Sequence, residues 1–313
     1  MKTNPSSLQI NECISFYLNN LLIKDYTMKT IDNKSENLRF FREWLHSQNI
    51  QNLQSVDLDV FEDYMAFLRN KKCNNKDKNL APSTVRSRLT SVRVFIQFLT
   101  KREIVTHREV EKFELPTIGL ILPKPILSYE DVLRIIKQIP QNTVKGIRDR
   151  AIVECFYASG IRRSELAALN LLDVDFSNYQ LRVVQSKNKK DRYAPFGKTA
   201  GKWLKKYLRD VRPLYASLCS GNAFFLNTAG MRFGTSNLSS LMSKYIKKAN
   251  INKTGACHQY RHAAATHMLD NEADIRHVQE FLGHASISTT QLYLHVSKAK
   301  LRRVYTKTHP RAD

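Results

Sequence analysis

The amino-acid sequence predicts a mainly α-helical protein with a small β-sheet, divided into two domains. Its 313 residues are more than one average domain needs. Apolar residues recur at helical spacing through most of the chain, and one short segment alternates as strands do. Residues 115–126 contain three prolines and almost no helical periodicity, which indicates a linker. We therefore expect a helical domain over residues 1–110, a linker over 111–127 and a mixed domain over 128–313.

The first domain is expected to be all helical. Each helix shows apolar residues on one side, so the helices can pack around a common core. Asp57 has the side chain of a helix N-cap. The helices are expected near residues 7–22, near residues 27–48, from Asp57 and from Pro82.

The helix that begins at Pro82 has an apolar stripe from Val85 to Leu99 and basic residues off that stripe. This distribution suits contact with a DNA groove or backbone. It equally suits a solvated face, and the sequence leaves both interpretations open. The candidate DNA-binding residues are Arg86, Arg88 and Arg93.

The second domain is expected to combine helices with two short strands. It opens with Ser128-Tyr129-Glu130-Asp131, a sequence typical of a capping box. The strands are expected at residues 181–185 and 192–196, around a polar turn. Helices are expected near residues 129–138, 147–158 and 198–217, and again over residues 236–306.

The charge of the chain indicates a nucleic-acid partner. Fifty Lys and Arg against 28 Asp and Glu give a net charge of +22. Residues 1–110 carry 17 basic and 12 acidic side chains, and residues 111–313 carry 33 and 16, so the second domain holds most of the charge. A polyanion is the natural partner of such a field. An acidic membrane surface is the alternative, but no basic amphipathic helix lies at a terminus.

Several other classes of protein are disfavoured. No run of about 18 apolar residues is present, so we expect no membrane span. The N-terminus lacks the pattern of a signal peptide, so we expect a cytoplasmic protein. The five cysteines are far apart and form no CxxC pair, which argues against structural disulfides and a zinc knuckle.

Two segments of the second domain place basic residues at defined positions. In YASGIRRSEL, residues 157–166, Gly160 should end one helix immediately before the next, which puts Arg162 at a tight junction. The turn between the two strands carries Lys187. Taken alone, Arg162 could simply cap a helix against Glu165, which we expect to be structural, and Lys187 could belong to a solvated loop.

Two further segments add histidine, arginine and tyrosine. In HQYRH, residues 258–262, His258 and Arg261 share one face of a helix. The segment Leu282-Gly-His284 is followed nine residues later by Tyr293. Taken alone, Tyr293 is better explained as a packing residue. His258 and His262 have a spacing that suits zinc, but no HExxH motif and no third ligand accompany them.

Together these segments resemble the tyrosine recombinase (phage integrase) family. Its pattern is an Arg in a G-L-R-x-S-E-L turn, a hairpin Lys, an H-x-x-R pair, an L-G-H and a nucleophilic Tyr, and all five occur here in order. The length and the ending His309-Pro-Arg-Ala312 are most similar to the bacterial Xer-type recombinases. The resemblance spans the whole chain and is strongest from about residue 128 to residue 312.

The resemblance implies a fold and an activity. Residues 1–110 would form a helical core-binding (SAM-like) domain, and residues 128–313 an α+β catalytic domain with a C-terminal tail helix. The two domains would clamp double-stranded DNA at specific recombination sites. The active form would be a homo-tetramer, or a hetero-tetramer with a paralogous recombinase. It would serve DNA integration, recombination or chromosome dimer resolution through a covalent 3′-phosphotyrosine intermediate.

The chemistry of strand exchange also follows from the residue types. A tyrosine oxygen can hold a phosphate covalently and later leave. Arginines offer paired planar donors to the phosphate oxygens, and a lysine can protonate the leaving oxygen as general acid. Fixed cationic side chains make a metal or cofactor unnecessary, so we expect none. The candidate catalytic residues are the nucleophile Tyr293, the arginines Arg162 and Arg261, the acid Lys187, and the proton-transfer or phosphate-binding histidines His258 and His284.

Two other functions remain open from the sequence. A type IB topoisomerase-like enzyme would relax DNA by similar chemistry without exchanging strands. A non-catalytic DNA-binding protein could retain the same fold.

Overall fold

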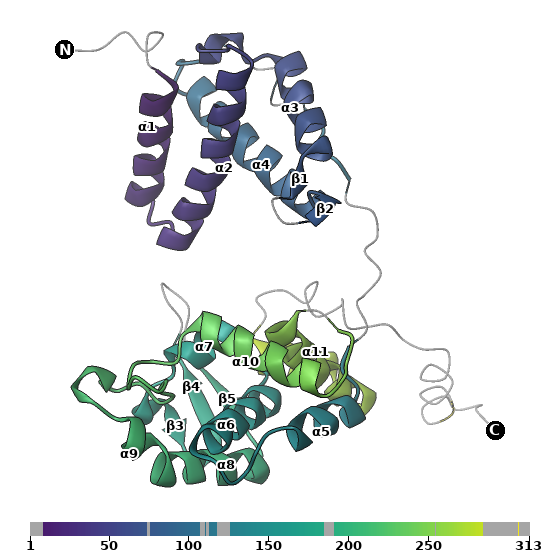
Figure 1. Cartoon of the computed structure of the whole chain (residues 1–313). Helices are drawn as coiled ribbons and strands as arrows, with labels where there is room; N and C mark the ends of the chain where they lie inside the picture. The colour runs from purple at the N-terminus through teal and green to yellow at the C-terminus, as the bar shows by residue number, and fades with distance from the viewer. Residues whose placement is uncertain are drawn as a thin grey trace. The chain divides into compact units, whose positions relative to one another are not determined.

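The chain folds into two compact units, Met1–Leu122 and Pro123–Asp313, each with its own hydrophobic core. The structure is a computed structural model that describes residues 9–73, 76–106, 110, 113–117, 126–184, 191–253, 255–283 and 306. Most of these residues are helical, and the largest sheet has three antiparallel strands (Figure 1). The predicted fold class, mainly α with a small β-sheet, is confirmed.

Four helices form the first unit around an aromatic core. Phe41, Trp44 and Tyr64 are buried together, with ring centroids 4.9 Å apart for Phe41 and Tyr64. Asp57 caps the third helix as predicted, since its carboxylate accepts the backbone N–H of Val60 at 2.9 Å. The helices are α1 (Ile10–Ile23), α2 (Met28–Ser47), α3 (Leu58–Asn70) and α4 (Pro82–Thr100).

The expectation that the first unit is all helical is wrong at one place. Strands β1 (Lys72–Cys73) and β2 (Lys76–Asn79) pair antiparallel between α3 and α4. The backbone N–H of Leu80 also donates to the carbonyl of Lys71, at 3.1 Å. Apart from Cys73, this segment consists of lysines, asparagines and an aspartate, with no apolar alternation. The side-chain pattern therefore does not reveal the backbone pairing.

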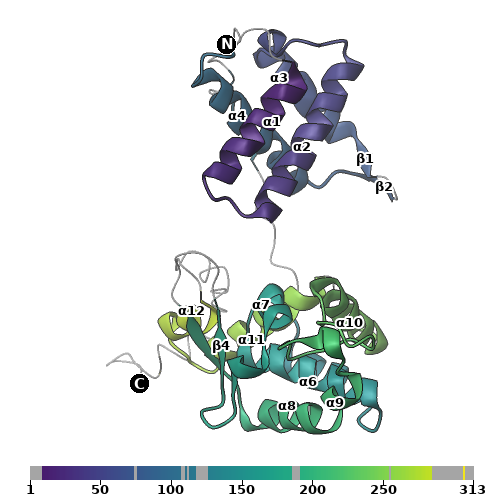
Figure 2. The ribbon, with the colours of Figure 1, turned by 90° about the vertical axis from the view of Figure 1, so that its left-hand side faces the viewer.

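The second unit is built around one buried helix, α6 (Val144–Ser159). Ala151, Ile152, Val153, Cys155 and Phe156 are all fully or almost fully buried. Such burial requires partners on several sides of the helix. Helices α8 and α11 pack on it, and both views of the ribbon place it inside the unit (Figures 1 and 2). The other helices are α5 (Tyr129–Lys137), α7 (Arg163–Ala168), α8 (Lys198–Asp210), α9 (Arg212–Tyr215), α10 (Thr235–Lys248), α11 (Ala256–Asp270) and α12 (Ile275–Leu282).

The predicted strand pair is present and is joined by a third strand. The sheet has the antiparallel order β3 (Val174–Asp175), β4 (Gln180–Val183), β5 (Arg192–Pro195). Leu181 pairs with Ala194 and both are buried, as the alternation predicts. Strand β3 has only two residues, which is too short for a period-2 signal. The predicted helix over 198–217 is divided into α8 and α9, because Pro213 cannot continue a helix from the preceding turn.

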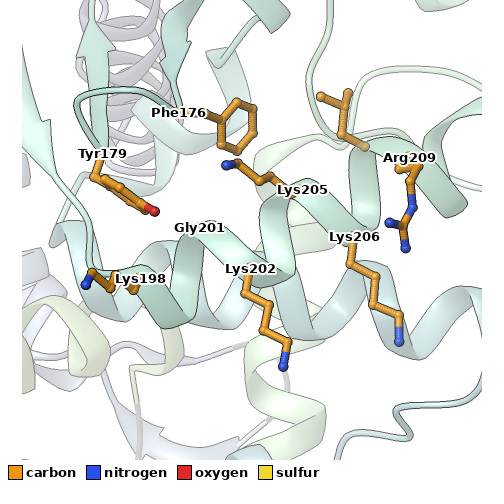
Figure 3. Close-up of a pocket in the computed structure, with 9 residues that line it drawn as sticks. Phe176, Tyr179, Lys198, Gly201, Lys202, Lys205, Lys206 and Arg209 are labelled. Atoms are coloured by element: carbon orange, nitrogen blue, oxygen red, sulfur yellow. The ribbon is translucent and has the colours of Figure 1, made fainter.

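Helix α8 lies on the side of the second unit away from α7 (Figure 2), and its outer face carries a row of lysines (Figure 3). A hollow of about 820 Å³ lies there (Figure 3). Tyr179 adopts a left-handed φ of +52° and lies against Gly201, where a Cβ would be 2.9 Å from its ring. Lys205 lies 5.5 Å from the centre of the Phe176 ring. The lysines of this face are Lys198, Lys202, Lys205 and Lys206.

In the part of the chain that the structure describes, no helix has the length and apolar character needed to cross a membrane.

Candidate active site

A tight junction between α6 and α7 positions Arg162. Gly160 follows the last residue of α6 and has a φ of +56°, a conformation that favours glycine. A side chain there would also collide with Phe281, whose ring lies 2.5 Å from the place of a Cβ. Helix α7 begins three residues later, and Arg162 is its N-cap. The predicted junction is confirmed.

The Arg162 guanidinium is held by two acceptors and remains accessible. Its Nη1 donates to Glu165 Oε1 at 2.8 Å, and its Nη2 donates to the carbonyl of Gly283 at 2.9 Å. The side chain is 41% exposed. A guanidinium has five N–H donors, so donors remain for a ligand from solvent.

Arg261 approaches the same place from α11. Its Nη1 donates to the carbonyl of Gly160 at 2.5 Å, and its Nη2 donates to the carbonyl of Leu282 at 2.7 Å. Leu282 ends α12, so its carbonyl belongs to those that have no partner within the helix. The C-terminal end of a helix also carries partial negative charge, which a guanidinium offsets. The ends of α6 and α12 thus bring the two predicted arginines together.

The two histidines of α11 differ in their surroundings. His258 lies one turn before Arg261 and is exposed. His262 is half-buried, and its ring centroid lies 6.2 Å from that of His258. Burial lowers the pKa of His262, and the nearby His258 and Arg261 lower it further, which favours the neutral imidazole. Over the described ranges no cluster of three or more His, Cys, Asp or Glu could hold a metal.

A second buried arginine was missed by the sequence analysis. Arg192 of β5 donates from Nη2 to Glu165 Oε2 at 2.8 Å, and the same oxygen accepts the backbone N–H of Arg162 at 2.6 Å. Glu165, expected to be structural, therefore binds two arginines. The register of the hairpin could have indicated that Arg192 is buried. Arg192 is two residues before the buried Ala194, so it lies on the same inner face of the sheet.

Three candidate residues lie outside the part of the chain that the structure describes. They are Lys187, in the segment 185–190, and His284 and Tyr293, which follow Gly283.

The sequence of the second unit matches the family described as Phage integrase family over residues 126–300. Residues 14–103 match a second family, the phage integrase N-terminal SAM-like domain. The chain belongs to the phage integrase family. The resemblance inferred from the motifs is thus confirmed.

Relatives within the phage integrase family extend over nearly the whole chain. The tyrosine recombinase XerD of Staphylococcus epidermidis is 34% identical over 304 residues, which is 97% of this chain and 100% of the relative. The tyrosine recombinase XerC of Pelotomaculum thermopropionicum is 35% identical over 262 residues, 82% of each chain.

Several solved structures share the fold of this chain. The XerA recombinase is 27% identical, covers 96% of this chain and 99% of its own, and has a TM-score of 0.52. The Tn1549 transposon integrase, solved with a circular intermediate DNA, has a TM-score of 0.78 at 16% identity, with 96% of this chain and 100% of its own covered. XerH bound to palindromic difH has a TM-score of 0.71 at 20% identity, with 89% and 80% covered.

In the SAM-like unit of this phage integrase, the three candidate DNA-binding arginines have different surroundings. Arg86 Nη1 donates to the carbonyl of Pro116 at 2.9 Å, and Arg93 Nη1 donates to that of Phe113 at 3.3 Å. Arg88 lies over the Phe40 ring, 3.8 Å from its centre. Only Arg86 of the three lines a polar groove of about 360 Å³ between α2 and α4, with Thr30, Asn33, Lys34, Asn37, Ser83, Ser87, Thr90 and Ser91.

Proposed function

We propose that this chain is a site-specific tyrosine recombinase that cleaves and rejoins DNA strands through a 3′-phosphotyrosine formed by Tyr293. The observation that carries the proposal is the meeting of Arg162 and Arg261 at the ends of α6 and α12. Two guanidiniums side by side suit the two non-bridging oxygens of one phosphodiester. Full-length relatives named tyrosine recombinases support the same activity.

The side chains would divide the reaction among them. Arg162 and Arg261 stabilise the charge that develops on the phosphate oxygens. Lys187 protonates the leaving 5′-oxygen, and His258 assists proton transfer from Tyr293. The remaining candidate, His284, donates to a phosphate oxygen. The set needs no metal or cofactor, because the positive charge comes from fixed side chains.

The partner would be double-stranded DNA with specific recombination sites. XerH and the Tn1549 integrase are solved as complexes with DNA, and lambda integrase is solved as a dimer on a core site. We propose that four protomers act together, as a homo-tetramer or with a paralogous recombinase, in DNA integration or chromosome dimer resolution in the cytoplasm. Residues 1–110 would form the core-binding domain, 111–127 the linker, and 128–313 the catalytic domain with its tail helix.

The first unit would contact DNA through α2 and α4. The groove between them is lined by hydroxyl, amide and cationic side chains, which are the usual donors to phosphates and base edges. Arg86 lies in this groove and keeps further donors beside its bond to Pro116. We assign Arg88 and Arg93 to DNA contacts outside this groove, where their ring and carbonyl contacts hold them in place.

Trapping with supercoiled plasmid DNA tests the nucleophile. The wild-type chain should form a covalent adduct that denaturing detergent preserves, and Tyr293→Phe should bind DNA equally but form none. Removal of the hydroxyl alone leaves the ring in place. An adduct from Tyr293→Phe would assign the nucleophile elsewhere.

The same assay separates the alternative functions. Joined products from two separate duplexes distinguish a recombinase from an enzyme that only relaxes DNA. Absence of any adduct from the wild-type chain, with DNA binding intact, would leave only the non-catalytic protein.

The tail tests the proposed assembly. Residues 297–305 have Leu301, Val304 and Tyr305 at helical spacing, and a helix this short needs a surface to pack on. We propose that each protomer packs its tail on the next protomer of a ring. Such a contact is heterologous, and it closes when the last tail reaches the first protomer. Deletion of residues 298–313 should spare binding to one site and abolish the pairing of sites and recombination, as judged by gel shift on single and paired sites. Normal recombination by the truncated chain would show that the tail does not need to pack on a neighbouring protomer.

A further inference from the structure

Arg192 supports both groups that bind the Arg162 side chain. Its Nη2 donates to Glu165 Oε2 at 2.8 Å, while Glu165 Oε1 accepts from Arg162. Its side chain also lies against Gly283, where a Cβ would be only 2.2 Å from Nε, and the Gly283 carbonyl accepts from Arg162. Arg192 therefore contacts the carboxylate on one side of Arg162 and the backbone on the other.

The burial of Arg192 is not explained by packing. The side chain is only 12% exposed, and its Nε and Nη1 have no hydrogen-bond partner among the described residues. Burial lowers the pKa of Arg192; Glu165 opposes this effect and the positive charge of Arg162 adds to it. Buried donors without partners destabilise the folded state. An apolar residue of similar length would fill this space without that cost.

The location of Arg192 also links it to the catalytic hairpin. It is the first residue of β5, five residues after Lys187 in the chain. Strand β5 packs against α12, which ends at Leu282. One side chain thus joins the hairpin, the N-terminus of α7 and the C-terminal end of α12.

We propose that Arg192 is a positioning residue for strand cleavage, which sets the orientation of the Arg162 guanidinium through Glu165 and Gly283. This rests on the proposed function. Because the Arg192 side chain is only 12% exposed and lies against Gly283, we expect it to act on the phosphate through Arg162 and not by contact. A donor fixed before the reaction needs no reorganisation when charge develops on the phosphate.

The variant Arg192→Met tests the role, with Arg182→Met as matched control. Arg182 lies on the adjacent strand β4, is 50% exposed, and lies 3.5 Å from Asp173 and 3.8 Å from Asp191, with no bond to Glu165. The substrate is a duplex with the site recovered from trapped adducts. We expect single-turnover cleavage by Arg192→Met to fall at least about tenfold, as for a loss of positioning. The dissociation constant for DNA should stay within about threefold, and Arg182→Met should change neither quantity beyond that. Cleavage by Arg192→Met within threefold of the wild-type rate would overturn the proposal.

A double-mutant cycle distinguishes action through Arg162 from an independent role. If Arg192 acts through Arg162, the pair Arg192→Met and Arg162→Lys should cleave within about threefold of Arg162→Lys alone, since the two sites are coupled. If the cleavage rate of the double variant instead falls by the product of the two single-variant losses, the proposal is overturned.

Folding and activity controls keep the outcomes distinct. Thermal unfolding reports whether Arg192→Met folds; if it does not, Arg192→Lys takes its place in the same cycle. Lys keeps the charge and one bond to Glu165, so its cleavage rate should fall between those of wild type and Arg162→Lys. If wild type forms no adduct, the proposed function fails and this inference with it. If wild type forms the adduct and the Arg192 variants match its rate, only this inference fails.

Discussion

Arg162 has a structural role in the protein without DNA as well as its proposed role in catalysis. Its bonds to Glu165 and Gly283 join α7 to the end of α12. The motifs predicted that Arg162 and Arg261 would act together, and the structure places both at neighbouring carbonyls. They could not predict Arg192, because its partner Glu165 is 27 residues away in the chain. Only the register of the hairpin turns Arg192 towards that carboxylate.

Replacement of Arg162 by Lys should separate charge from geometry. Lys keeps the positive charge but lacks the planar, paired donors with which Arg162 bonds Glu165 and Gly283 and still offers donors to a phosphate. We expect single-turnover cleavage to fall about a hundredfold or more, as for loss of one preorganised donor. Arg163→Lys is the matched control, because Arg163 is the exposed neighbour that bonds only Ser239 among the described residues. Near wild-type cleavage by Arg162→Lys would leave Arg162 a purely structural residue.

At the scale of the elements, helices with strong apolar periodicity were predicted close to their observed bounds. The capping box at the start of α5 is present, since Ser128 and Asp131 exchange bonds of 3.1 Å. The strands β1, β2 and β3 were missed, because β1 and β3 have only two residues each and β2 has no apolar alternation. The sequence also did not predict Lys253, which lies 122 residues from Asp131 and bonds it at 2.6 Å.

Asp131 should make the stability of the second unit depend on pH. Burial raises the pKa of its carboxyl, but bonds from Lys253, Arg134 and Ser128 outweigh this and lower the pKa to about 2. An unfolded Asp titrates near pH 3.9, so the folded state gains stability above that pH and loses it as the pH falls towards 2. Asp131→Asn should therefore lower the free energy of unfolding by about 2 kcal/mol at pH 7, and by roughly half of that at pH 3.

Urea unfolding at the two pH values measures the difference for Asp131→Asn. Glu280→Gln, at an exposed position of α12, is the control. An equal difference at pH 7 and pH 3 would show that the carboxylate bonds do not stabilise the fold.

At the scale of the whole molecule, each of the two units has its own core, but the net charge is divided unevenly between them. Each unit buries its own core, so each can keep its shape without the other. Most of the net charge of +22 comes from residues 111–313. Composition predicted the polyanionic partner, but not which surface receives it, because lysines also cover the outer face of α8 (Figure 3).

DNA binding should weaken steeply with salt, since counterions released on binding return at high concentration. Arg86→Ala should lower the slope of log affinity against log salt by about one. Lys206→Ala removes the same charge from the outer face of α8 and should leave the slope unchanged. Titration over a range of salt concentrations checks both variants. A flat response of the wild-type chain would exclude phosphate contacts as the main source of affinity.

The guanidiniums of Arg162 and Arg261 also bear on how this fold can evolve. They satisfy carbonyls at the ends of α6 and α12, so a mutation that abolishes cleavage at either position also removes a bond from the scaffold. A lineage that gave up catalysis but kept DNA binding would face selection to retain these arginines for stability alone. Such a descendant would still carry both arginines after it had stopped cleaving DNA.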